Sequence, residues 1–270
     1  MDEVAQFNRE RWNDLVAANV TYGQAWLDLD VAGAQQWLKK HYVSADLTDK
    51  DVLCLANGGG QQSAAFGLLG ANVTVIDMSD AQLEQDRVAA EHYGLNTRLE
   101  QGDMRDLSRF ADNSFDLVWH AYSINFVPDA RVVLQEVARI MRPDGLYYFQ
   151  FANPFLKLMG EEDWNGEGYV MKRPYIDGAE IIFADPHWDV GEQRVVGPRE
   201  FNHSLSTLVN TLVTNGFVLR GLWEDAEGTV GDIQAEPGSW EHFVGIAPPF
   251  LILLATYQPE ILARSNWVIG

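Results

Sequence analysis

The sequence predicts an α/β protein with a seven-stranded, mostly parallel sheet that closes with an antiparallel hairpin, together with N-terminal helices and an inserted lid. Apolar runs of strand length alternate with helical segments between residues 51 and 151, which is typical of parallel strands joined by right-handed crossovers. A glycine-rich turn, residues 57–60, follows the first apolar run. A further helix and two apolar runs come after a long irregular region, and these last two strands can pair at one edge of the sheet.

The stretch from Asp51 to Asp77 has the order strand, glycine turn, helix, strand and acid. The expected strand, helix and second strand occupy residues 52–56, 61–69 and 73–76. Glycine in the turn lets a ligand lie against the backbone, and the start of the next helix offers unpaired N–H groups. Asp77 stands 19 residues after Gly58, close to the roughly 20 expected for an acid that accepts hydrogen bonds from ribose hydroxyls. The stretch therefore predicts the first half of a nucleotide-binding unit.

The later elements follow from apolar spacing and from turn residues. They are expected as a helix at 81–93, strands at 97–100 and 115–119, a helix opened by Pro128-Asp129, a strand at 146–151, a helix at 205–214 and strands at 217–223 and 250–257. The helix at 81–93 is expected to bury its apolar stripe and expose its acids, with Leu83, Val88 and Ala89 in the core and Glu84, Asp86 and Glu91 facing solvent.

The composition changes along the chain and divides it into three regions. Residues 3–43 have helical spacing and are expected to pack over an edge or the mouth of the core, with Trp12 and Trp37 as packing residues. Pro and Gly interrupt every long helical pattern for about 50 residues after the fifth strand, which indicates a covering insertion. Residues 224–249 indicate another surface excursion. The predicted division is an N-terminal helical cap at 1–45, a cofactor-binding core at 46–151 and 202–260, and a substrate-covering insertion at 152–201.

The charge and the cysteine content narrow the function classes. The formal net charge of −20 argues against a nucleic-acid surface and against binding to anionic membranes. The single cysteine, Cys54, lies in an expected buried strand, so no intramolecular disulfide can form and a reducing compartment fits. The N-terminus lacks the basic and apolar regions of a secretion signal, and the apolar run at 250–257 is too short to span a bilayer. A soluble, cytoplasmic protein is expected.

A metal site is not expected from the sequence. No group of His, Cys, Asp and Glu has the spacing of a ligand set, and the nearest approach is Asp185 and His187 with Asp189. The predicted chemistry is therefore metal-free.

Four stretches of the chain resemble a known family of enzymes. The segments DVLCLANGGGQQSAAFGLLGANVTVID, WHAYS, RPDGLYYF and LSTLVNTLVTNGFVL are similar to class I S-adenosylmethionine-dependent methyltransferases, especially the small-molecule branch near the ubiquinone and menaquinone biosynthesis enzymes. The resemblance covers residues 45–157 well and 200–257 moderately, and it implies a Rossmann-like fold with S-adenosylmethionine as the cofactor. The chain departs from the family at two positions, where Cys54 replaces the usual acid and Ala56 replaces the usual glycine.

The resemblance also implies a role for each part of the cofactor site. The glycine turn would hold the methionine portion, the acid ending the second strand would hold ribose, and the residues beside it and after the third strand would contact adenine. The implied cofactor residues are Ala56, Asn57, Gly58, Gly60, Asp77, Met78, Asp103, Met104 and His120. From the residues alone, Asp103 either bonds a base amino group or caps the next turn.

The expected reaction is in-line methyl transfer to a small-molecule acceptor. Transfer from a sulfonium requires alignment in a dry site, and it requires a base only when the acceptor is a hydroxyl, a protonated amine or an acidic carbon. Histidine is the natural base near neutral pH, and the expected catalytic residues are His120, Tyr122 and His203. The residues expected to hold the acceptor are Tyr22, Tyr122, Tyr175, His187 and Trp188. The lid is compatible with an aromatic, quinone-like or amine acceptor, and the sequence leaves the oligomeric state open.

Two other functions fit parts of the sequence. An NAD-dependent oxidoreductase is the first, because Asp77 would serve an NAD ribose equally well, although the three glycines lack the G-x-G-x-x-G spacing. A non-catalytic small-molecule-binding protein with a vestigial cofactor loop is the second, because Cys54 and Ala56 depart from the family pattern. Cofactor affinity separates the second alternative from the enzymes.

Overall fold

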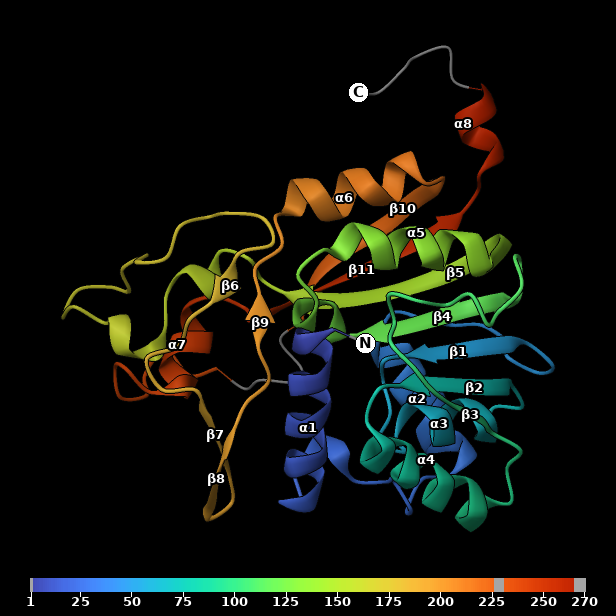
Figure 1. Ribbon diagram of the computed structural model, residues 1–270, viewed down its shortest axis with the longest axis horizontal. Helices are drawn as coiled ribbons and strands as arrows, with labels where there is room; N and C mark the ends of the chain where they lie inside the picture. Colours follow the sequence, from blue (N-terminus) through green and yellow to red (C-terminus); the bar gives the residue numbers. More distant parts are fainter. Residues whose placement is uncertain (1, 226–230, 265–270) are drawn as a thin grey trace.

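The core of the protein is a seven-stranded sheet with the strand order β10-β11-β5-β4-β1-β2-β3 (Figure 1). The computed structural model describes residues 2–225 and 231–264. The strands of the sheet are β1 (Asp51–Leu55), β2 (Asn72–Asp77), β3 (Arg98–Gln101), β4 (Phe115–Ala121), β5 (Met141–Ala152), β10 (Phe217–Asp225) and β11 (Phe250–Tyr257).

The first five strands are parallel, and the last strand is antiparallel to both of its neighbours. β1 pairs in parallel with β2 and β4, β2 with β3, and β4 with β5. β11 pairs antiparallel with β5 on one side and with β10 on the other. The prediction of a mostly parallel sheet with a closing antiparallel hairpin is confirmed. Because the parallel strands share one direction, their carboxyl ends meet at one edge, where ligands bind in open α/β sheets.

Helices cover both faces of the sheet (Figure 1). One face carries α5 (Ala130–Ile140) and α6 (Leu205–Thr214), and the other carries α2 (Val31–Lys40), α3 (Gln62–Leu68) and α4 (Asp80–Tyr93). Side chains of β1 alternate between the two cores: Leu53 and Leu55 pack with α5, whereas Val52 and Cys54 pack with α2 and α3. This two-residue alternation decides which side chains of each strand face the site.

The helix α4 buries an acid that was expected to face solvent. Leu83 and Ala89 are buried as predicted, and Glu84 and Glu91 are exposed. The prediction for Asp86 is wrong, because its side chain is only 1% exposed. Asp86 lies three residues before Ala89, on the side of the helix that faces the core. The expectation that it faces solvent rested on its charge, because charged side chains are usually exposed.

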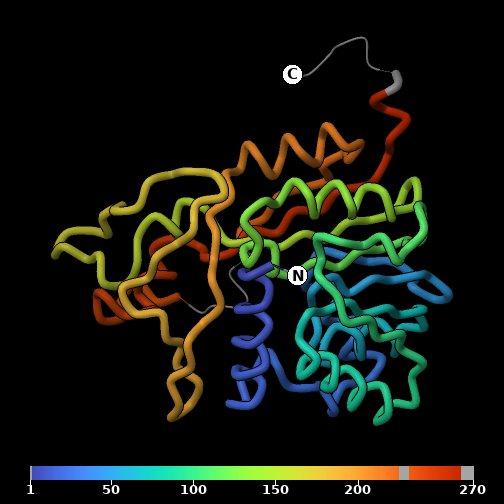
Figure 2. The backbone as a smooth tube through the Cα atoms, viewed as in Figure 1, coloured from blue at the N-terminus to red at the C-terminus, as the bar shows by residue number. Residues whose placement is uncertain are grey.

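The N-terminal helix α1 (Glu3–Ala17) lies across the edge of the sheet, beside the carboxyl ends of the strands (Figures 1 and 2). It is followed by the short 3₁₀ helix η1 (Thr21–Gly23). The buried Asn8 fixes α1 in place, since its amide donates to the carbonyl oxygens of Phe126 and Arg199 and accepts from the Arg199 N–H. The prediction that the N-terminal helices pack over the mouth of the core therefore holds for α1.

The segment after β5 forms small sheets and short turns beside α1 (Figure 2). β6 (Glu180–Ile181) pairs with β9 (Glu200–Phe201), and β7 (His187–Val190) pairs with β8 (Gln193–Val196). The remaining short helices are η2 (Ser123–Phe126), η3 (Leu156–Leu158), η4 (Glu161–Asp163), α7 (Trp240–Ile246) and α8 (Glu260–Arg264).

The region expected to be a plain surface excursion, 224–249, contains α7. This helix packs against the segment that follows β5, because Phe243 and Val244 form a small apolar cluster with Leu156. Residues 226–230 of that region lie outside the described residues. None of the helices in the described parts of the chain has the length and apolar character needed to cross a membrane.

Candidate active site

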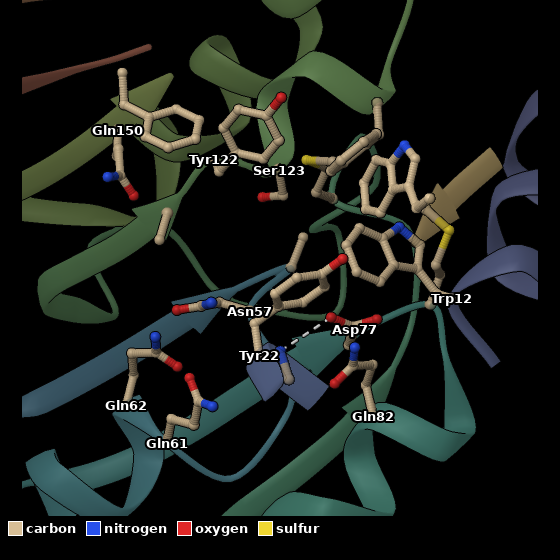
Figure 3. A pocket seen from close by; sticks show the side chains of 18 residues that line it. Trp12, Tyr22, Asn57, Gln61, Gln62, Asp77, Gln82, Tyr122, Ser123 and Gln150 are labelled. Carbon is tan, nitrogen blue, oxygen red and sulfur yellow. Dashed lines mark hydrogen bonds between the residues drawn. The ribbon is translucent and has the colours of Figure 1, made fainter. Parts of the chain in front are cut away.

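A cavity of about 390 Å³ opens at the carboxyl ends of β1, β2 and β4. This volume lies in the range of roughly 300–1,000 Å³ that is usual for small-molecule sites. One side is formed by the glycine loop and by polar side chains of α3 and α4, and the opposite side by β4, the end of β5 and aromatic side chains (Figure 3). The two sides differ in chemistry, so the cavity has a polar end and an aromatic end.

The glycine loop and Asp77 form the floor of the polar end. The N–H of Gly58 donates to Asp77 Oδ2 at 3.0 Å (Figure 3). The N–H of Ser79 donates to Asp77 Oδ1 at 2.9 Å. Burial raises the pKa of Asp77, and these backbone hydrogen bonds oppose that rise. A Cβ atom at Gly58 would lie 2.8 Å from the Cβ of Gln82, so only glycine fits between the strand end and α4.

Two polar atoms at the polar end are buried without a hydrogen-bond partner among the described residues. They are Asn57 Oδ1 and Gln82 Oε1, and both side chains line the cavity. An unpaired buried amide oxygen costs about 1–3 kcal/mol, so these atoms indicate that a ligand with N–H or O–H donors completes the site. Asp77, which keeps accepting capacity on its carboxylate, fits ribose hydroxyls. The site therefore fits a nucleoside-containing cofactor.

Most of the expected cofactor residues come together at this end. Ala56, Asn57, Gly58, Asp77, Met78 and Met104 all line the cavity. Gly60 and Asp103 do not. Gly60 lies against α4, and Asp103 forms an ion pair with Arg105 at 2.6 Å, which holds its carboxylate away from the cavity.

His120 lies outside the cavity, which corrects the expectation that it faces the reaction site. Its side chain is fully buried on the α5 face of β4, where Nδ1 is 2.7 Å from the Tyr147 hydroxyl and the ring lies beside Phe149. Burial lowers the pKa of His120 to about 3, so the ring is neutral at physiological pH. The alternation of β4 turns Ala121, the next residue, toward the cavity instead.

The other expected histidines also lie away from the cavity. His203 is buried with Nε2 3.1 Å from the carbonyl oxygen of Ile124, and burial lowers its pKa. His187 is partly exposed on β7, where it pairs with Asp185 at 2.8 Å. Neither residue belongs to the cavity lining.

Tyr175, expected as an acceptor residue, is not brought to the cavity either. Its ring stacks on Phe155 with centroids 5.2 Å apart, and its hydroxyl accepts from the Leu205 N–H. Tyr175 therefore joins the inserted segment to the start of α6.

Tyr22, Trp188 and Tyr122 do line the cavity, and they form its aromatic end with residues that the sequence did not single out. Trp12, expected as a packing residue, lies edge-on to Tyr22 at 6.0 Å and to Trp188 at 6.1 Å between ring centroids. Tyr122 meets Phe250 edge-on at 4.9 Å. Further lining residues missed by the sequence reading are Gln61, Gln62, Gln82, Ser123, Phe126 and Gln150. Gln61, Gln62 and Ser123 adjoin or belong to segments that the sequence did single out. No local signal marks Gln82 and Gln150, because they reach the cavity from α4 and β5.

A buried charge pair lies directly behind the aromatic end. The Tyr122 hydroxyl donates to Glu200 Oε2 at 3.1 Å, and Lys157 Nζ lies 2.5 Å from the same oxygen. Glu200 is 3% exposed. Burial and the Glu200 carboxylate raise the pKa of Tyr122, and burial also raises the pKa of Tyr22. Both hydroxyls therefore stay protonated at neutral pH.

The fold and the cavity define an α/β protein whose cavity at the strand ends fits a nucleoside-containing cofactor, and comparisons with known proteins show its family. Residues 53–149 match the family model described as "Methyltransferase domain". The chain is 37% identical over 187 residues to the uncharacterized methyltransferase YbaJ of Bacillus subtilis, covering 67% of this chain and 71% of that relative. The chain therefore belongs to the methyltransferases.

Two further similarities concern part of the sequence and the fold. A ubiquinone biosynthesis O-methyltransferase of Actinobacillus pleuropneumoniae is 34% identical over 118 residues, covering 41% of this chain and 49% of that relative. The chain thus spans about half the length of that enzyme. The structure of an S-adenosylmethionine dependent methyltransferase from Mesorhizobium loti is 17% identical, covers 86% of this chain and 100% of that chain, and has a TM-score of 0.57. At this identity the structural similarity shows a common fold.

Proposed function

We propose that the protein transfers a methyl group to a small molecule with a flat, largely apolar acceptor end, inside the cavity at the strand ends. One observation carries the proposal: a single cavity joins the polar end around Asp77 to the aromatic end around Trp188. Donor and acceptor can therefore lie end to end in one enclosed space, as an in-line displacement requires.

The polar end is proposed to hold the cofactor. Asp77 would accept hydrogen bonds from ribose hydroxyls, and Met78 and Met104 would pack on the adenine ring. The unpaired oxygens of Asn57 and Gln82 would accept from donor groups of the cofactor. When bound, S-adenosylmethionine supplies a methyl group on a positively charged sulfur, which is a good leaving group. The described cavity lining contains a carboxylate and no Lys or Arg, so its charge suits a cationic donor.

The aromatic end is proposed to hold the acceptor, with the segment 152–201 as its cover. Trp188 from that segment and Trp12 from α1 meet over the cavity mouth, and such faces suit an aromatic, quinone-like or amine molecule. The relatives named for O-methylation in ubiquinone biosynthesis favour an aromatic hydroxyl within this group. Enclosure by these rings would also exclude water from the reacting centre.

The acceptor is proposed to be oriented by Tyr122. Its hydroxyl is fixed by the bond to Glu200, and Glu200 is held in turn by Lys157. His120 and His203 lie outside the cavity, so the nearest carboxylate that could receive an acceptor proton at the aromatic end is Glu200, reached through Tyr122. Tyr122 would thus hold the acceptor, as the sequence led us to expect, and Glu200 behind it would take the role of base expected for the histidines.

The proposal can be tested by separating the two ends of the cavity. S-adenosylhomocysteine binding is measured by calorimetry with NAD as the control ligand, and acceptor turnover is measured as S-adenosylhomocysteine release over a panel of phenols, quinols, aliphatic alcohols and amines. Asp77→Ala is expected to weaken S-adenosylhomocysteine binding by about tenfold or more, because a hydrogen bond to a charged group is lost.

A matched pair of tryptophan variants tests the acceptor end. Trp188→Ala is expected to raise the KM for the acceptor while leaving cofactor affinity unchanged. Trp240→Ala, which removes a partly exposed tryptophan outside the cavity, is expected to change neither. The proposal is wrong if Trp188→Ala weakens cofactor binding and leaves the acceptor KM unaltered, or if turnover prefers aliphatic over aromatic acceptors.

A further inference from the structure

The glycine loop is hydrogen-bonded to a buried carboxylate, that of Asp86, which has no role in the site described above. Asp86 of α4 is 1% exposed, and its Oδ2 accepts from the N–H of Gly59 at 2.9 Å. Its Oδ1 accepts from the Ser63 hydroxyl in the first turn of α3, and the backbone of Gly60 also hydrogen-bonds to this carboxylate. One buried side chain thus ties together the loop, the helix that follows it and α4.

The loop depends on such contacts because its backbone is irregular. Gly59 and Gly60 have φ values of +120° and +71°, which side-chain-bearing residues rarely adopt. A Cβ atom at Gly60 would lie 2.4 Å from the carbonyl oxygen of Gln85, so the loop rests directly on α4. Two neighbouring N–H groups are then held by two different acids, Gly58 by Asp77 and Gly59 by Asp86.

Cys54 faces the same region from the strand below the loop. Its side chain is fully buried in the core that it shares with Leu83 of α4, the helix that carries Asp86. Burial and, to a smaller extent, the Asp86 carboxylate raise the pKa of its thiol. The thiol is a weak hydrogen-bonding group, and the Gly59 N–H instead donates to Asp86 and, at 3.2 Å, to the carbonyl oxygen of Gln82. We propose that Asp86 is a positioning residue that sets the glycine loop against the cofactor, supplying from α4 the carboxylate that position 54 lacks.

This inference rests on the proposed binding of the cofactor at the glycine loop, and the first test compares variants of one helix. Asp86→Ala is expected to weaken S-adenosylhomocysteine binding by about tenfold or more, because the Gly59 N–H and the Ser63 hydroxyl lose the buried side chain that accepts their hydrogen bonds. Asp86→Asn is expected to stay within about threefold of wild type, because its amide oxygen still accepts from Gly59 and its N–H₂ group can donate to the Ser63 hydroxyl. Glu84→Ala, which removes an exposed acid of the same helix, is the control and is expected to change nothing.

The second test moves the acid to the other side of the loop. In the double variant Cys54→Asp/Asp86→Ala the carboxylate returns on β1, and S-adenosylhomocysteine affinity is expected to recover most of the loss seen in Asp86→Ala. The unfolding temperature is measured alongside. A purely structural role for Asp86 predicts that the double variant regains stability without regaining affinity, and that result would overturn the inference.

The outcomes also separate this inference from the proposed function. If Asp77→Ala weakens binding and Asp86→Ala does not, the positioning role fails while the cofactor site stands. If wild type itself binds no S-adenosylhomocysteine, the proposed function fails. If Asp86→Ala does not fold, the double variant Cys54→Asp/Asp86→Ala decides. The inference is supported if the double variant folds and recovers S-adenosylhomocysteine affinity. It is overturned if the double variant does not fold, or if it folds and its affinity is more than about tenfold below that of wild type.

Discussion

The burial of Asp86 gives the protein a dependence of stability on pH that can be tested with a single atom exchange. Burial raises the pKa of Asp86 from its ordinary value of 3.8 to about 7, although hydrogen bonds from Ser63 and the glycine loop oppose the rise. The folded state therefore binds this proton more tightly than the unfolded state does. The contribution of Asp86 to the free energy of unfolding is complete below about pH 4 and is lost as the pH rises to about 7.

The magnitude follows from the size of the shift. Each pKa unit corresponds to about 1.4 kcal/mol, so a rise from 3.8 to about 7 sets an upper limit of about 4 kcal/mol lost between acid and neutral pH. Asp86→Asn removes the titration while keeping the shape of the side chain. The free energy of unfolding of this variant, relative to wild type, is therefore expected to increase between pH 5 and pH 8, by about 1–3 kcal/mol after allowance for relaxation of the site.

The assay is urea unfolding of both proteins at pH 5 and pH 8, followed by far-UV circular dichroism. The difference between the two proteins is compared at each pH, because the contributions of other titrating groups then largely cancel. Glu84→Gln serves as the control, since this exposed acid has a lowered pKa and titrates below the window. A difference between Asp86→Asn and wild type that is equal at both pH values would refute the reasoning.

Three further predictions test the loop, the histidine and the charge pair. Gly60→Ala is expected to lower the free energy of unfolding by at least about 2 kcal/mol, because the new Cβ would lie 2.4 Å from a backbone oxygen. Gly94 has a similar φ of +66° and nothing within 4 Å of the position of a Cβ, so Gly94→Ala is the control and is expected to lower the free energy of unfolding by only about 1 kcal/mol in the same urea titration. His120→Asn is expected to leave the pH profile of kcat/KM unchanged, and the disappearance of a limb near neutral pH would contradict its placement outside the cavity. Glu200→Gln keeps the hydrogen-bonding geometry but leaves Lys157 unneutralised, so kcat is expected to fall by about tenfold at unchanged S-adenosylhomocysteine affinity. Equal loss of kcat and affinity would show that Glu200 serves the fold instead.

Local patterns were sufficient to predict the fold and most residues of the polar end of the cavity. The run from Asp51 to Asp77 places strand, loop and acid within one continuous unit, so its geometry depends on short-range chain connectivity. Ala56, Asn57 and Gly58 accordingly line the cavity together with Asp77, as expected from the sequence. At Cys54, by contrast, the sequence lacks the acid that is usual in the family. The acid that we propose replaces it, Asp86, stands 32 residues later in the chain on α4.

The histidines show where residue type and position along the chain are insufficient. His120 and Ala121 are neighbours at the end of β4, but the pleat of the strand sends one side chain into the α5 core and the other toward the cavity. Asp86 shows the same limit on a helix, because polarity suggested the exposed face while its position on the inward stripe placed it under the loop.

Short, continuous segments of the chain carry the signals for the α/β architecture, for the methyltransferase family and for most residues of the polar end of the cavity. The aromatic end, which we propose holds the acceptor, depends on the tertiary structure. Trp12, Trp188 and Phe250 come from α1, β7 and β11, and they meet only because the N-terminal helix and the inserted segment fold over the carboxyl ends of the same sheet. Long-range packing of this kind leaves no local periodicity or spacing in the chain, since each of these aromatic residues would serve equally well in an ordinary core.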